Sequence, residues 1–264
     1  MTLETAPPRN VPALLTALHT RKDSATVLVS GSPGGVIHVR HGLVVAMETP
    51  AAPGVEVLLL KSRRIAEEDW TALRATGTDP AHLARELVAR GLLGAAELEI
   101  TGQAALFDAA FALALTRPEG WEAAEPRPHL DTGTAVPPAR MVGETSRRIR
   151  LLANERGATA RFARDRLAPA PAAGDPARLA RLSSRHRAVL TTADGRRTPR
   201  DIAFTLGRGL FAVMLDLRDL LALGFLQPLA ATASDRPSTA PRTPPHTSAA
   251  APRPSATPLP RRKR

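Results

Sequence analysis

The chain lacks cysteine and tyrosine, and only 3% of its 264 residues are aromatic. Without cysteine there is no disulfide framework, no cysteine zinc site and no cysteine nucleophile. The scarcity of aromatics argues against the base-stacking surfaces of RNA-recognition and cold-shock domains. The N-terminal residues do not form a secretion signal, and no apolar run approaches the length of a membrane span. We therefore expect a cytoplasmic, non-enzymatic protein with no cofactor, no metal and no membrane contact.

The net charge of +11 is unevenly distributed along the chain. Residues 1–137 hold 12 basic and 16 acidic side chains, residues 138–228 hold 17 and 8, and the residues from 229 onward hold 7 and 1. All but three of the 36 basic residues are arginine, which is consistent with GC-rich coding. A coding bias does not explain the asymmetry, which indicates an anionic partner for the C-terminal half.

Composition also divides the chain into segments. Two stretches contain enough large apolar residues to fold, and the others are rich in proline or in small polar residues. Consecutive prolines favour extended backbone, and a tail of Ala, Ser, Thr, Pro and Arg buries too little surface to offset its ordering entropy. The predicted parts are a flexible leader (1–10), a first domain (11–124), a Pro-rich linker (125–138), a second domain (139–228) and a disordered basic tail (229–264).

The first domain is expected to be α+β. A short helix over 11–20 precedes three strand-like runs, at 25–30, 35–41 and 43–49, which are joined by glycine-containing turns. This pattern is typical of an antiparallel meander. From residue 54 onward the spacing becomes helical, and the predicted helices cover 54–60, 67–74, 79–91 and 96–115.

This first segment resembles the PATAN-type domain of bacterial regulatory proteins. The residues that carry the resemblance are Gly42, Val45 and Ala46 at the strand turn, Arg64-Ile65, and Asp108-Ala109 with Phe111. The resemblance covers about residues 11–124 and rests on packing and turn signals. It implies an interaction or signal-reception module that binds a protein partner, and it implies no ligand.

The second domain is expected to be mainly helical. Helices are predicted over 138–157 and 178–195. Thr198-Pro199-Arg200-Asp201 then carries the signals of a helix start, and Leu210 opens a nearly ideal apolar stripe. Phe225-Leu226 begins a short strand. Three helices with a tight glycine turn before the third, followed by a strand, resemble a winged-helix variant of the helix-turn-helix over about 179–228.

Four arginines lie near the predicted starts of the last two helices: Arg196, Arg197, Arg200 and Arg208. Helix N-termini carry free N–H groups, so arginines beside them suit phosphate binding. We therefore expect these four side chains to contact the backbone of double-stranded DNA, as part of a transcriptional regulator. The alternative interpretation of the same residues is a solvated face in an arginine-rich protein.

The third helix argues for a different partner. Its outward positions include Phe211, Leu215, Asp216, Arg218 and Asp219, and two acids with two apolar residues suit a phosphate-lined groove poorly. The alternative is a signalling adaptor whose winged-helix-like domain binds protein through Phe211, Leu215 and Arg218.

Other patterns receive ordinary interpretations. Residues 31–35 (GSPGG) join two strands and lack the Lys-Ser/Thr of a phosphate loop, so they predict a hairpin turn. His38 and His41 lie on opposite faces of a strand without a third ligand, so we expect no metal site. A 3-4-3 spacing admits a homodimer seam over Val142, Thr145, Ile149 and Leu152, but the seam is short and favours packing within the chain.

Overall fold

The computed structural model describes residues 10–76, 79–153 and 156–229. The described residues fold as α+β, with an antiparallel sheet and helices first and a mainly helical part after them. The predicted leader and tail lie outside the described residues, apart from Asn10 and Leu229.

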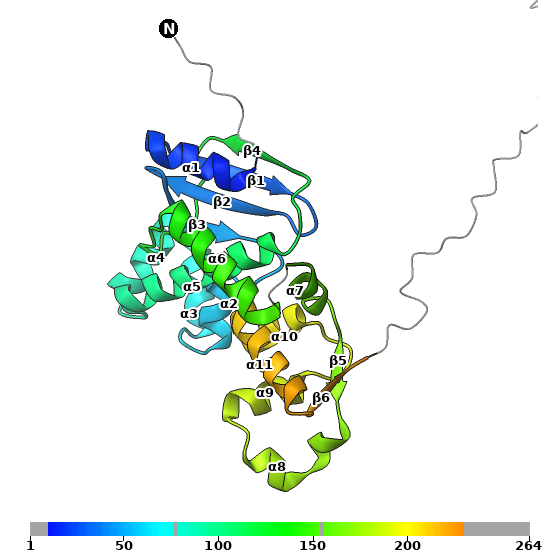
Figure 1. The fold of residues 1–264 in the computed structure, drawn as a ribbon. Helices are drawn as coiled ribbons and strands as arrows, with labels where there is room; N and C mark the ends of the chain where they lie inside the picture. The colour runs from blue at the N-terminus through cyan, green and yellow to red at the C-terminus, as the bar shows by residue number, and fades with distance from the viewer. Residues whose placement is uncertain (1–9, 77–78, 154–155, 230–264) are drawn as a thin grey trace, which may run out of the picture. The chain divides into compact units, whose positions relative to one another are not determined.

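A four-stranded antiparallel sheet forms the N-terminal part (Figure 1). Its strands are β1 (Ala25–Ser30), β2 (Gly35–Arg40), β3 (Leu43–Glu48) and β4 (Gly120–Ala124), in the order β3-β2-β1-β4. The predicted three-strand meander is confirmed. The fourth strand was not predicted, because its sequence GWEAA alternates weakly and directly precedes the prolines. Helix α1 (Val11–Arg21), capped by the Asn10 side chain, buries three leucines in the core of the sheet.

The predicted helices of the first segment are present. They are α2 (Val55–Lys61), α3 (Glu67–Ala75), α4 (Pro80–Ala89) and α5 (Ala95–Ala114). Apolar residues of α2–α4 and of the start of α5 form a small core around Trp70, Leu73 and Leu87. The rest of α5 packs against β3, so this helix joins the small core to the core of the sheet.

The Pro-rich segment 125–138 packs against the first domain instead of forming an exposed spacer. Thr132, Thr134 and Val136 are buried, and the Val136 backbone exchanges two hydrogen bonds with Val44 of β3. The Thr134 hydroxyl donates to the carbonyl of Glu99 on α5. Composition did not predict this docking. The contacts are made by two threonines and one valine, and such a segment does not look apolar enough to be buried.

The second half consists mainly of helices. They are α6 (Pro138–Ala153), α7 (Arg156–Phe162), α8 (Pro176–Ala180), α9 (Ser184–Thr192), α10 (Pro199–Leu206) and α11 (Leu210–Ala222). The predicted helix over 178–195 is two helices, because Ser183 leaves the helical conformation and caps α9. A short strand, β6 (Leu226–Pro228), pairs with β5 (Leu167–Pro169), which comes from upstream and was not predicted.

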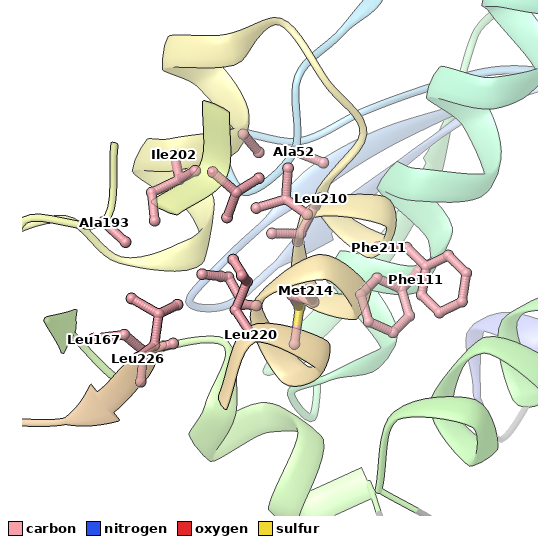
Figure 2. Packing of buried hydrophobic residues seen from close by; sticks show 14 of the residues in the cluster. Ala52, Phe111, Leu167, Ala193, Ile202, Leu210, Phe211, Met214, Leu220 and Leu226 are labelled. Atoms are coloured by element: carbon pink, nitrogen blue, oxygen red, sulfur yellow. The ribbon is translucent and has the colours of Figure 1, made fainter. Parts of the chain in front are cut away.

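One hydrophobic core crosses the predicted domain boundary. Ala52, Phe111, Ala112 and Leu115 of the first half share a cluster with the helices α9, α10 and α11. Figure 2 shows Phe111 of α5 facing Phe211 of α11, and the two ring centres lie 5.5 Å apart. The described residues from Asn10 to Leu229 belong to one compact unit.

Hydropathy gives a further observation on the helices. Within the described ranges, none of them combines the length and the apolar character needed to cross a bilayer.

Candidate functional site

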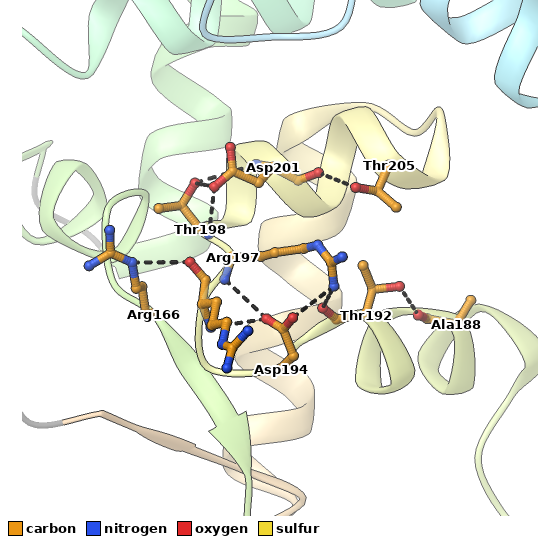
Figure 3. Close-up of polar contacts among 9 residues, drawn as sticks. Arg166, Ala188, Thr192, Asp194, Arg197, Thr198, Asp201 and Thr205 are labelled. Atoms are coloured by element: carbon orange, nitrogen blue, oxygen red, sulfur yellow. Dashed lines mark hydrogen bonds and ion pairs between the residues drawn. The ribbon is translucent and has the colours of Figure 1, made fainter.

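The predicted site residues lie near the start of α10 and along α11. The preceding helix α10 ends at Gly207, whose positive φ of 59° favours glycine, and Gly209 is the N-cap of α11. α10 itself begins with the predicted capping box, in which Thr198 and Asp201 bond each other's backbone amides (Figure 3). The sequence signals for both helix starts are therefore confirmed.

Arg208 does not offer its charge to solvent. Its Nη2 lies 2.7 Å from Oδ2 of Asp216 in α11, and its side chain is only 27% exposed. Asp216 was predicted to point outward, but it is buried, and Arg185 and His186 of α9 each approach it to 3.4 Å. A buried carboxylate requires such partners, because an isolated charge in the core is costly.

The other three predicted arginines lie near the start of α10. Arg197 donates to Asp194 at 2.9 Å and to the carbonyl of Thr192, so its charge is locally balanced (Figure 3). Arg200 is exposed and lies over the ring of Phe204 at 5.8 Å. Arg196 is exposed, and its backbone amide is bound by Asp194. Of the four, Arg196 and Arg200 therefore present the more accessible charges.

The predicted protein-binding surface on α11 is largely engaged within the chain. Phe211 is 8% exposed, because it packs against Phe111 and lies under the guanidinium of Arg148 at 4.9 Å. Leu215 is half-buried against the same core. Arg218 donates to the carbonyl of Leu151 on α6 and to Asp219. Phe211 is therefore not available to a partner, whereas Leu215 and Arg218 contact the chain and stay partly exposed.

Asp108 of α5 occupies the N-terminal end of α11. Its Oδ1 accepts a hydrogen bond from the amide of Phe211 at 3.4 Å, and a methyl group added at Gly209 would lie 2.2 Å from its Oδ2. A carboxylate is the group expected at a helix N-terminus, where free N–H groups and the helix dipole favour negative charge. The position that could hold a DNA phosphate is filled by the chain itself.

Arg148 of α6 completes this contact. Its Nη1 donates to Asp108 at 2.6 Å, its Nε donates to Glu144 at 2.9 Å, and its side chain is 13% exposed. Burial raises the pKa of Asp108, and the Arg148 charge together with the α11 amides opposes that rise. Hydrogen bonds from Arg147 and Arg148 lower the pKa of Glu144 to about 2. Asp108 and Arg148 thus connect α5 and α6 to the first turn of α11.

The sequence carried only part of this information. An aspartate inside the apolar helix over 96–115 is unusual, but its sequence gives no partner. Arg148 belongs to an Arg-Arg-x-Arg run whose members look alike, and only the fold turns this one inward. The predicted seam of α6 is used within the chain: Thr145 and Ile149 are buried, whereas Val142 is exposed.

His38 and His41 do not come together in a metal site. Across residues 10–229, in the part that the structure describes, no three His, Asp or Glu side chains form a group that could hold a metal ion. His38 is buried and stacks on the ring of His129 at 4.5 Å, whereas His41 is exposed in the turn after β2.

Comparison of the chain with protein-family models, with curated proteins and with solved structures finds no match. The resemblances to PATAN-type and winged-helix domains therefore remain interpretations of the motifs.

Proposed function

We propose that the chain is a non-enzymatic regulatory protein that acts as an adaptor, contacting protein partners rather than reading DNA sequence. The observation that carries the proposal is the burial of α11. From Leu210 to Leu221 every residue of this helix is buried or half-buried, and α5 and α6 pack against it. A helix that reads DNA needs an exposed face with side chains that reach base edges in the major groove.

The electrostatics of the same region support the proposal. The α11 N-terminus is neutralised by Asp108, and Asp216 balances Arg208. A winged-helix-like arrangement that covers its third helix has lost the means of direct readout but keeps an ordered surface on α8, α9 and α10. On that surface we place the contact with one protein partner, distinct from any partner of the first half.

A second candidate function is sequence-independent binding to the DNA backbone. The observation that favours it is the charge of residues 138–228, with exposed arginines on α8, α9 and α10. Arg196 and Arg200 are exposed, and no ion pair is found for either among the described residues, whereas the exposed Arg197 pairs with Asp194. Contacts of this kind position a protein on a duplex but carry no sequence information.

Duplex selection tests the two candidates on a chain truncated after Leu229, which removes the seven basic residues beyond it. Selection from random duplexes should enrich no sequence. Any binding should be weak, and the R196A/R200A variant should lower the slope of log K against log salt by about 0.9 per lost contact. The matched control is R85A/R117A, which removes two exposed arginines of the first half.

The adaptor proposal also predicts what a photo-crosslinking amino acid captures in native cells. Placed at position 200, it should capture protein, and placed at position 85 it should not capture the same protein. An enriched duplex sequence whose binding is lost in R196A/R200A would overturn the adaptor proposal in favour of sequence-specific DNA binding.

A further inference from the structure

A pocket of about 720 Å³ lies between the sheet and the helices of the first half. Its walls come from β3, from the segment that leads into α2, from α3 and α4, and from one face of α5. Residues 128–132 of the Pro-rich segment form part of the same wall. The volume falls in the range of small-molecule sites, which is roughly 300–1,000 Å³.

The wall is mainly apolar. On α5 it is made by Ala105, Leu106 and Ala109, and opposite them lie Met47 of β3 and Leu83 of α4. Leu106, Ala109 and Met47 belong to the core of the sheet, and Leu83 belongs to the smaller core around Trp70, so the pocket is lined by residues of both cores. An apolar ligand body would complete the packing of both.

Trp70 supplies an unused hydrogen-bond donor in this wall. The residue is 4% exposed, and its indole nitrogen is buried without a hydrogen-bond partner among the described residues. Buried tryptophan N–H groups usually have a partner, and leaving such a donor unsatisfied costs about 1–3 kcal/mol. A ligand acceptor at this point would remove that cost.

His129 supplies a second unused polar atom. Its Nδ1 lies 3.3 Å from the carbonyl oxygen of Arg127, which can only accept, so Nδ1 carries the proton. Its Nε2 is then an acceptor in the neutral ring, and it is buried without a partner among the described residues. The ring is held in place by stacking on His38.

Other polar side chains of the wall are already engaged. Thr49 donates to the carbonyl of Gly34, Thr132 donates to Thr134, and Arg74 pairs with Glu56 at 3.1 Å. Glu48 is exposed. Apart from the exposed carboxylate of Glu48, the side-chain groups of this wall that lack a partner among the described residues are the donor on Trp70 and the acceptor on His129.

We propose that this pocket binds a small amphipathic molecule that offers an acceptor to Trp70, offers a donor to His129 and buries an apolar body against α5. Amides and hydroxy-carbonyl compounds of suitable size have this chemistry. The inference does not depend on whether the C-terminal helices contact protein or DNA. α5 lines the pocket and also carries Asp108, which accepts a hydrogen bond from the first turn of α11. A bound ligand would therefore contact the helix that connects to the start of α11.

The test uses the full chain and the fluorescent probe 1-anilinonaphthalene-8-sulfonate, which combines an apolar ring system with an N–H donor and acceptor oxygens. The folded protein should bind it saturably at one site, with enhanced probe emission. In W121F, which leaves Trp70 as the sole tryptophan, the probe should quench the remaining protein fluorescence. Binding should also raise the melting temperature, because the ligand binds the folded state.

Two substitutions locate the probe. A105F fills the pocket from α5 and should abolish binding, whereas A104F, on the exposed face of the same helix, should leave it unchanged. W70F removes the N–H donor and should weaken binding roughly three- to tenfold. Circular dichroism establishes whether each variant is folded. If A105F does not fold, the comparison of W70F with the wild type tests the proposal.

Equal probe binding by the wild type, A105F and W70F would overturn the proposal, since the probe would then lie elsewhere. The absence of saturable binding to the folded wild type would overturn it as well.

Discussion

Buried ionisable side chains distinguish this chain at the scale of the residue. Asp108, Arg148 and Asp216 are buried or nearly so, and each meets a partner of opposite charge from another element or turn. Removing one member of such a pair is destabilising, because the other remains buried without compensation. These residues therefore fix which helices meet, and they do so at the place where a nucleic-acid ligand was expected.

His38 gives the residue-scale prediction. Burial, with the nearby charges of His129 and Arg127, lowers its pKa from 6.5 to about 4. Between these values the unfolded chain binds the proton and the folded protein does not, so stability rises with pH across this window. The free energy of unfolding should fall by as much as about 2–3 kcal/mol as the pH is lowered from 7 to 4.

Urea denaturation at a series of pH values measures this dependence. H38L should flatten the profile between pH 6.5 and 4, whereas H82L, at an exposed histidine of α4, should preserve it. A profile that keeps its full slope in H38L would contradict the assignment.

At the scale of the element, the start of α11 is defined by what lies in front of it. Gly209 and Gly94 are both N-caps without a side-chain hydrogen bond, for α11 and α5 respectively. A Cβ at Gly209 would meet Asp108, whereas a Cβ at Gly94 would meet nothing within 4 Å. G209A should therefore destabilise the protein by about 2 kcal/mol or more, since it separates a buried charge pair from its amide partners.

G94A is the matched control and should cost only a few tenths of a kcal/mol, the ordinary difference between glycine and alanine at an N-cap. Chemical denaturation of the two variants measures both values. Equal losses of unfolding free energy in G209A and G94A would show that Asp108 does not contact the α11 N-terminus.

A second pair of glycines tests how the Pro-rich segment docks. Gly102 of α5 faces Thr132, whose Oγ1 would lie 2.0 Å from an added Cβ, whereas Gly143 of α6 faces open space. Replacing a helical glycine by alanine normally stabilises by about 0.5–1 kcal/mol. G143A should show that gain, and G102A should destabilise and open residues 128–136 to limited proteolysis. Protection of that segment in G102A would contradict the docking.

Local signals predicted the elements well and their long-range partners poorly. The capping box at Thr198, the glycine turn before α11 and the three-strand meander are each encoded within a few residues, so the sequence was sufficient. β4 and β5 depend on partners far away in the chain, and their own sequences carry little strand pattern. The predicted exposure of Phe211 was wrong because the helical stripe of α11 does not reveal that α5 and α6 cover its other face.

At the scale of the whole molecule, the described residues form one unit, although composition suggested two domains and a linker. The core that contains Phe111 also contains α9–α11, and the Pro-rich segment is docked on the first half. A shared core of this kind predicts that both halves unfold together. It is also the basis of our proposal that α11 does not read DNA, because α5 and α6 pack against it.

Native-state hydrogen exchange tests this central claim most directly, by comparing amides of α11 between Val213 and Leu220 with amides of β1 in the wild type and in D108A. If the helix and the sheet belong to one cooperative unit, both sets are strongly protected in the wild type. D108A, which leaves Arg148 facing the α11 N-terminus without its carboxylate, should lower both protections by the same free energy, about 3 kcal/mol. Loss of protection in α11 alone, with β1 unchanged, would contradict the account and return the chain to two independent domains.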